Sequence, residues 1–205
     1  GPDNYRDCCF DSALRAAGVG FLSNIIENHD EPRGASRYLP EEAANDPRAQ
    51  KALAAVQVLL PGLPFLYQGQ EIGMTNTVFS SIDAVDDVNT HGEYAAALAA
   101  GLTPGEALAR VARWSRDNAR TPMQWDGSEN GGFTGGTPWI SVNPNCEKIN
   151  AASQVDDPDS IFSYYKTLIQ LRREHDVISQ GDFAPLDPEN PSVLAYRRSW
   201  EGTEL

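Results

Sequence analysis

The chain has 205 residues, of which 40% are hydrophobic and 22% charged, as is typical of one soluble globular domain. Its formal net charge is −13, from 29 acidic against 16 basic residues. Such a charge repels phosphate backbones and anionic lipid headgroups, so we expect neither nucleic acid nor a membrane surface as a partner and favour a neutral ligand.

The first predicted element is a buried strand over residues 21–27. This run is short and mostly apolar, and it stops at the polar cluster Asn28, His29 and Asp30, with Pro32 close behind. The strand is therefore expected to deliver polar groups at its C-terminal end.

A helix and a second strand are predicted next. Asp46 can cap the helix and Pro47 suits its first position, and apolar residues then recur at helical spacing until Pro61. An apolar strand over 63–67 follows at once. Two strands joined by a helix through short loops predict parallel pairing covered by helices, in either a barrel or a doubly wound sheet.

The stretch 68–157 is rich in Gly, Asn, Asp, Thr and Pro, and one or two helices are predicted within it. One of them starts at a capping box formed by Thr103 and Glu106. Loops of this length in a compact domain usually carry a binding function, so ligand contacts are expected here.

A last helix is predicted to open at Asp157, with one apolar stripe and with Arg172, Arg173 and Glu174 facing outward near its end. A strand over 193–198 then indicates the start of a new sheet.

Targeting and metal-binding signals are absent from the sequence. No apolar run approaches the roughly 20 residues that span a bilayer, and residues 1–10 lack a signal-peptide pattern. The cysteine count is odd, and Cys8 and Cys9 are adjacent, which disfavours an ordinary disulfide. The three histidines lie far apart. We therefore expect reduced thiols, a cytoplasmic location unless a signal precedes residue 1, and neither metal nor cofactor.

Three segments carry a specific pattern when they are read together and in this order. Residues 27–33 read ENHDEPR, residues 63–76 read LPFLYQGQEIGMTN, and residues 115–125 read SRDNARTPMQW. With these motifs the chain resembles the oligo-1,6-glucosidase and α-glucosidase branch of the α-amylase family, glycoside hydrolase family 13, over nearly its whole length.

The resemblance implies an α/β fold, namely the last strands and helices of a (β/α)8 TIM barrel followed by the start of a C-terminal β domain. Residues 1–180 would belong to the barrel, with a long active-site loop region over 68–157. Residues 181–205 would begin the truncated β-sandwich domain. The seventh barrel strand would end at Asp30 and the eighth near Tyr67.

The resemblance also implies roles for three residues. Asp30 would be the third carboxylate of the catalytic set, a ligand of the sugar's 2- and 3-hydroxyls whose hydrogen bonds strengthen in the transition state. His29 would be the matching hydroxyl donor, and Arg116 would reach the glucose of the first subsite. The nucleophilic Asp and the general-acid Glu would precede residue 1, so the chain alone is expected to be inactive.

We expect other polar residues of the loop region to stabilise the loop or to face solvent. Arg120 lies four residues after Arg116. We expect Arg120 to brace the loop through an ion pair and not to bind substrate. The acidic run Asp83, Asp86 and Asp87 is expected to be solvated surface.

The function implied by the resemblance is that of an exo-acting α-glucosidase, which removes glucose from short α-linked oligosaccharides with retention of configuration. A small oligosaccharide would be its partner. Trehalose-phosphate hydrolases, sucrose isomerases and trehalose synthases share these motifs and remain alternatives. A non-catalytic amylase-like binding module is an alternative of another class, although the presence of His29, Asp30 and Arg116 favours an enzyme.

Overall fold

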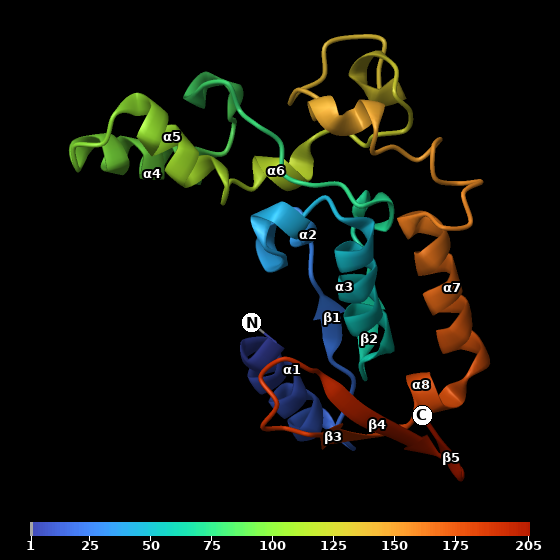
Figure 1. Cartoon of the computed structure of the whole chain (residues 1–205). Helices are drawn as coiled ribbons and strands as arrows, with labels where there is room; N and C mark the ends of the chain where they lie inside the picture. Colours follow the sequence, from blue (N-terminus) through green and yellow to red (C-terminus); the bar gives the residue numbers. More distant parts are fainter. Residues whose placement is uncertain (1) are drawn as a thin grey trace. The chain divides into compact units, whose positions relative to one another are not determined.

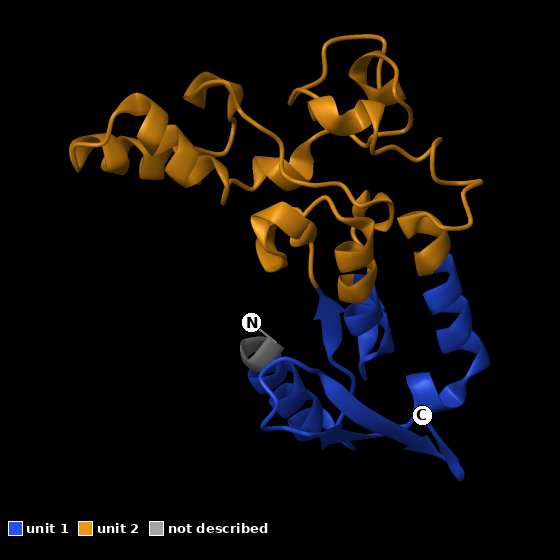
Figure 2. Ribbon diagram, in the orientation of Figure 1, with its two compact units in different colours: residues 1–25, 54–65, 166–205 blue, residues 26–53, 66–165 orange. Residues whose placement is uncertain are grey.

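The computed structural model describes the backbone of residues 2–205 and the side chains of residues 6–205. Two compact units are present (Figure 2): unit 1 comprises the residues up to 25 together with 54–65 and 166–205, and unit 2 comprises 26–53 and 66–165. The helices and strands, labelled in Figure 1, are α1 (Pro2–Ala16), β1 (Ser23–Ile25), α2 (Gly34–Tyr38), α3 (Pro47–Leu59), β2 (Leu63–Phe65), α4 (Val88–Ala99), α5 (Pro104–Ala112), α6 (Asp117–Arg120), α7 (Ile161–Glu174), α8 (Asp176–Ser179), β3 (Asp182–Leu186), β4 (Ala195–Trp200) and β5 (Thr203–Glu204).

Unit 1 contains the parallel strand pair that the sequence predicts. β1 and β2 run side by side, with Ser23 opposite Leu63 (Figure 1). Both strands are shorter than the predicted 21–27 and 63–67. The prediction that the first is buried is wrong in the described chain, where Ile25 is 45% exposed. Each has a single partner strand in the described chain, so ladder hydrogen bonds define it along one edge only.

α3 is the helix predicted between these strands. The carboxylate of Asp46 accepts a hydrogen bond from the backbone nitrogen two residues later at 2.9 Å, which is the predicted N-terminal cap. The side chain of Gln57 is fully buried. Its amide nitrogen donates to the carbonyl oxygens of Asn24 at 3.0 Å and Phe65 at 2.7 Å, so one helix residue is bonded to both strands.

The C-terminal strands form an antiparallel sheet in unit 1, in the order β3, β4, β5. The strand predicted over 193–198 is β4, displaced by two residues. Phe183 of β3 and Tyr196 of β4 meet Phe10 of α1 edge-on, with ring centroids 5.0 and 5.8 Å from that of Phe10. Residues from the two ends of the chain therefore pack together within this unit.

The C-terminal end of α3 is capped by two arginines from late in the chain. Arg172 of α7 donates from Nη1 to the carbonyl oxygens of Val58 at 2.8 Å and Leu60 at 3.1 Å. Arg198 of β4 donates from Nη1 to the carbonyl oxygen of Leu59 at 3.3 Å. Burial lowers the pKa of both guanidiniums. The prediction that Arg172 faces outward is wrong, because the last carbonyls of a helix lack internal partners and attract cations.

Gly62 offers a sharp test of how the strand pair is joined. Its φ of +117° is rare for other residues, and a Cβ there would lie 2.5 Å from the carbonyl oxygen of Leu22. That oxygen accepts the hydrogen bond from the nitrogen of Leu63 at 2.7 Å. Gly62→Ala is therefore expected to destabilise the protein by about 1–3 kcal/mol in thermal unfolding. Gly105→Ala is the control, since a Cβ in the first turn of α5 meets nothing within 4 Å.

For that control we expect a change of less than about 1 kcal/mol, in the stabilising direction, because alanine is the better helix former. Equal Tm values for the two variants would contradict the tight approach at Gly62.

Unit 2 contains the whole stretch 68–157, which folds into more helix than predicted, namely α4, α5 and α6. α5 begins with the predicted capping box: Oε2 of Glu106 accepts from the nitrogen of Thr103 at 2.9 Å, and Oγ1 of Thr103 accepts from the nitrogen of Glu106 at 3.4 Å. Buried amides hold the irregular backbone. Gln124 is fully buried and donates to Oδ1 of Asn145 at 2.9 Å. Among the described helices, none combines the length and apolarity that crossing a bilayer requires.

Candidate active site

The polar cluster that follows β1 opens unit 2. Oδ1 of Asn28 accepts from the backbone nitrogen of Asp30 at 2.7 Å, and this local turn ends the extended segment. Nε2 of His29 lies 3.3 Å from Oδ2 of Asp30. The side chain of Asp30 is 53% exposed, so a ligand can reach the carboxylate.

Two guanidinium groups converge on Asp30. Nη2 of Arg120 lies 2.9 Å from Oδ1 of Asp30, and its Nε donates to the carbonyl oxygen of His29 at 3.0 Å. Nη1 of Arg116 lies 3.5 Å from the same Oδ1. The three residues predicted from the sequence therefore lie together. Arg120, expected to brace the loop, does hold the backbone at His29, but it also makes the shorter contact with Asp30. The spacing of four residues, which places both arginines on one side of a helical turn, is the signal that indicates this.

Asp87 is the second residue that the sequence analysis missed. Its side chain is buried, so the prediction of solvated surface is wrong at this position. Oδ1 accepts from Nε of Arg116 at 2.9 Å and also from Nη2, while Oδ2 accepts from the hydroxyl of Thr90 at 2.8 Å. Burial acts to raise the pKa of Asp87, but the hydrogen bonds outweigh it and lower the pKa to about 2. The bond to Asp87 in turn raises the pKa of Arg116.

Asp117 links the two arginines through the backbone before α4. Its buried Oδ2 accepts from the nitrogens of Asp86 at 2.6 Å and Asp87 at 2.8 Å, and its Oδ1 lies 3.4 Å from Nη1 of Arg120. The contacts therefore form a closed circuit, called the charged ring below. Its members are Asp30, Asp87, Arg116, Asp117 and Arg120. Three carboxylates and two guanidiniums give the ring a formal charge of −1.

A buried ion pair fixes the loop that carries Asp30. Nη1 of Arg33 lies 3.2 Å from Oε2 of Glu27, and both side chains are almost fully buried. Arg33 also donates to the carbonyl oxygens of Gln68 at 2.7 Å and Ala119 at 3.4 Å. Burial raises the pKa of Glu27, and the charge of Arg33 opposes that rise. This one guanidinium thereby connects the segments after β1 and β2 to α6.

The arrangement presents a carboxylate acceptor beside guanidinium and imidazole donors. Together, this acceptor and these donors can bind neighbouring hydroxyls of a neutral ligand, because each hydroxyl both donates and accepts a hydrogen bond. Among the described residues, no group of three or more His, Cys, Asp or Glu side chains is placed to hold a metal ion.

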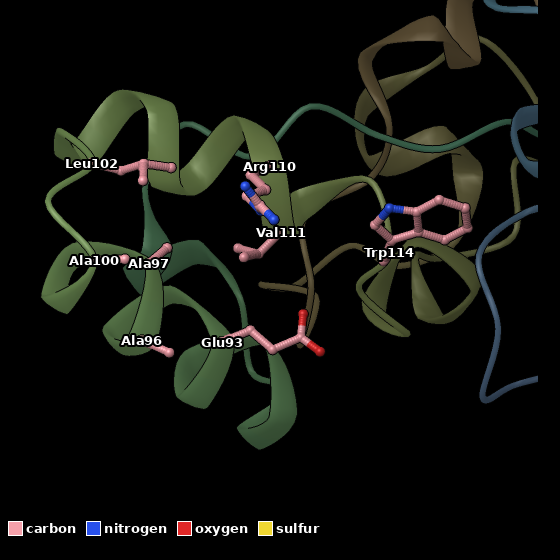
Figure 3. Close-up of a pocket in the computed structure, with 8 residues that line it drawn as sticks. All are labelled: Glu93, Ala96, Ala97, Ala100, Leu102, Arg110, Val111 and Trp114. Atoms are coloured by element: carbon pink, nitrogen blue, oxygen red, sulfur yellow. The ribbon is translucent and has the colours of Figure 1, made fainter.

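A groove of about 520 Å³ between α4 and α5 is a separate feature (Figure 3). Alanines line much of it, and its charged side chains are Glu93 and Arg110. The groove shares no residue with the charged ring. Two charged groups among mostly apolar side chains, Trp114 and Leu102 included, offer few partners for a polar ligand, so we place the candidate site at Asp30.

Comparison with known proteins shows the family to which the sequence is similar. The family model described as "Alpha amylase, catalytic domain" matches residues 5–181. The chain is 43% identical to an oligo-1,6-glucosidase of Parageobacillus thermoglucosidasius over 189 residues, 92% of this chain and 34% of that protein. It is 39% identical to a trehalose-6-phosphate hydrolase of Bacillus subtilis (strain 168) over 189 residues, with coverage of 92% and 34%.

Among solved structures, a mutant of isomaltulose synthase from Erwinia rhapontici NX5 in complex with its natural substrate sucrose is similar, with a TM-score of 0.89 and 38% identity. The similarity covers 98% of this chain and 36% of that one. The chain thus spans about a third of the length of the curated relatives that it matches.

Proposed function

The chain belongs to the α-amylase family, and from this premise we propose that it is a C-terminal fragment of a retaining α-glucosidase that removes glucose from short α-linked oligosaccharides. The observation that carries the proposal is the exposed carboxylate of Asp30, which lies between Arg116 and Arg120 and beside His29. This site offers both acceptors and donors to adjacent sugar hydroxyls.

In the proposed mechanism Asp30 binds two ring hydroxyls and His29 donates to one of them. As the sugar ring flattens toward an oxocarbenium ion, the hydroxyls become better donors and their bonds to a fixed carboxylate strengthen. Arg116 supplies a further donor from Nη1, the nitrogen that faces Asp30. The nucleophile and the general acid would be supplied by the part of the protein upstream of residue 1.

The proposal extends to the domain organisation. Residues 1–180 would be the last part of a (β/α)8 barrel, whose seventh strand is β1, which ends at Ile25 rather than at the expected Asp30, and residues 181–205 would begin a C-terminal β domain. The antiparallel pairing that starts at Asp182 supports this division. The odd cysteine count and the adjacency of Cys8 and Cys9 disfavour ordinary disulfides, which supports a reducing compartment and hence a cytoplasmic location.

A phosphorylated disaccharide is the less favoured substrate for this part of the site. A sugar phosphate needs a cation that is free to pair with it. Both guanidiniums of the charged ring are already bonded to carboxylates, and the ring as a whole carries a formal charge of −1. A neutral oligosaccharide suits this balance better.

The test is an assay of the full-length protein, meaning the longer protein that contains this chain, on isomaltose, sucrose and trehalose 6-phosphate. We expect glucose release from isomaltose, with α-glucose as the first anomer seen by NMR. The 205 residues alone are expected to release none, because they lack the nucleophile and the acid.

Isomaltulose formed from sucrose would instead make the protein an isomerase, and preferred cleavage of trehalose 6-phosphate would make it a phosphate-sugar hydrolase. Sugar binding without turnover would support a non-catalytic module. Turnover by the 205 residues alone would contradict the upstream position of the catalytic pair.

A further inference from the structure

We propose that Asp87 is a positioning residue, which fixes the guanidinium of Arg116 so that Nη1 faces the sugar-binding carboxylate of Asp30. The inference rests on the proposed function, since it concerns how that same site is held before substrate arrives.

The contacts between the two side chains assign a direction to the guanidinium. Oδ1 of Asp87 accepts hydrogen bonds from Nε of Arg116 at 2.9 Å and from Nη2. The edge of the guanidinium that carries these two groups is therefore occupied. Nη1, on the other edge, lies 3.5 Å from Oδ1 of Asp30. Asp87 therefore determines which N–H groups Arg116 presents to the site.

Asp87 is held firmly enough to act as the fixed partner. Its side chain is 2% exposed, whereas that of Arg116 is 31% exposed. Its Oδ2 accepts from the hydroxyl of Thr90 at 2.8 Å, and its backbone nitrogen donates to Asp117 at 2.8 Å. Because Asp87 is bonded on several sides and Arg116 is partly solvated, the arginine adapts to the aspartate rather than the reverse.

Removal of the charge at Asp87 should change the site in a definite way. Arg120 already lies 2.9 Å from Asp30, while Arg116 is kept at 3.5 Å. Without its carboxylate partner, Arg116 would be drawn toward Asp30 and would compete with sugar hydroxyls for Oδ1. It would also lose the fixed orientation on which rate depends.

The variant for the test is Asp87→Asn in the full-length protein. Asp87 also caps α4, where its side chain accepts from the nitrogen of Asn89, and asparagine is an equally good capping residue. We expect kcat/KM for isomaltose to fall about ten- to a hundredfold, while Tm stays close to the wild-type value. Thr103→Ala, which removes the cap of α5, is the control: Tm should fall and kcat/KM should not.

A double-mutant cycle separates positioning from general support. If Asp87 acts through Arg116, then Asp87→Asn should cause little further loss in an Arg116→Ala background. Equal losses in both backgrounds would overturn the proposal, as would wild-type kcat/KM in the single variant.

A crystal structure of Asp87→Asn gives a readout that needs no activity. The guanidinium of Arg116 should leave its present place and approach Asp30. An unchanged Arg116 would overturn the inference even in an active enzyme, whereas a wild-type protein without glucosidase activity would overturn only the proposed function.

Discussion

Asp30→Asn in the full-length protein is expected to lower kcat for isomaltose by about a hundredfold to a thousandfold, with little change in Tm. Asparagine keeps the shape of the side chain but removes the charge that two guanidiniums now hold at 2.9 and 3.5 Å. The hydroxyls of the flattening sugar would lose the acceptor that strengthens their bonds. Half of the side chain is exposed, so the fold should tolerate the change. Steady-state kinetics and a melting curve measure the two effects.

Asp46→Asn is the matched control for this substitution. Asp46 also pairs with an arginine, Arg48 at 3.0 Å, and caps a helix, but it contacts no member of the charged ring. Its kinetics should stay at the wild-type level. Turnover near wild type in Asp30→Asn would remove Asp30 from the catalytic set, and a large drop in Tm would make its role structural.

Arg33→Met is expected to reduce the free energy of unfolding by about 3–5 kcal/mol, because it leaves the buried carboxylate of Glu27 without its partner. The variant also loses the hydrogen bonds to the carbonyl oxygens of Gln68 and Ala119. Thermal or denaturant unfolding of the full-length protein gives the measurement. In the double variant Glu27→Leu/Arg33→Met part of the loss should return, since no charge is then buried alone.

The comparison for this prediction is Arg37→Met. Arg37 pairs with Glu31 at the surface, where both side chains are about a third exposed, and such pairs contribute roughly 0–1 kcal/mol. Similar losses for Arg33→Met and Arg37→Met would show that the buried pair does not support the fold.

The parts of the fold that the sequence predicts well are those specified by neighbouring residues. The cap at Asp46, the capping box at Thr103 and the pairing of two strands around one helix all depend on local spacing or on short joins. The ends of the strands were predicted less well, because pairing partners determine them. Arg172 was placed on the wrong side of α7, since the carbonyl oxygen of Val58 that it reaches lies 114 residues earlier.

In the candidate site, too, neighbouring residues could be predicted from the sequence, whereas contacts between distant residues could not. The motif around His29 and Asp30 is contiguous, so its polar groups can be recognised without a structure. Arg120 meets Asp30 across 90 residues and Asp87 meets Arg116 across 29. No local pattern specifies these contacts, and in a linear reading an acidic run such as 83–87 is hard to distinguish from a solvated surface.

The capping of α3 by distant arginines has a consequence for how the chain matures on the ribosome. Arg198 follows Leu59 by 139 residues. At about 5–20 residues per second of synthesis, the end of this helix waits roughly 7–28 s for that guanidinium to emerge. During this interval the carbonyl oxygen of Leu59 must bond to water, although Arg172 emerges earlier and can already bond those of Val58 and Leu60. A nascent chain released before Arg198 would therefore keep an incompletely capped helix end, and we expect that end to open more readily than in the finished protein.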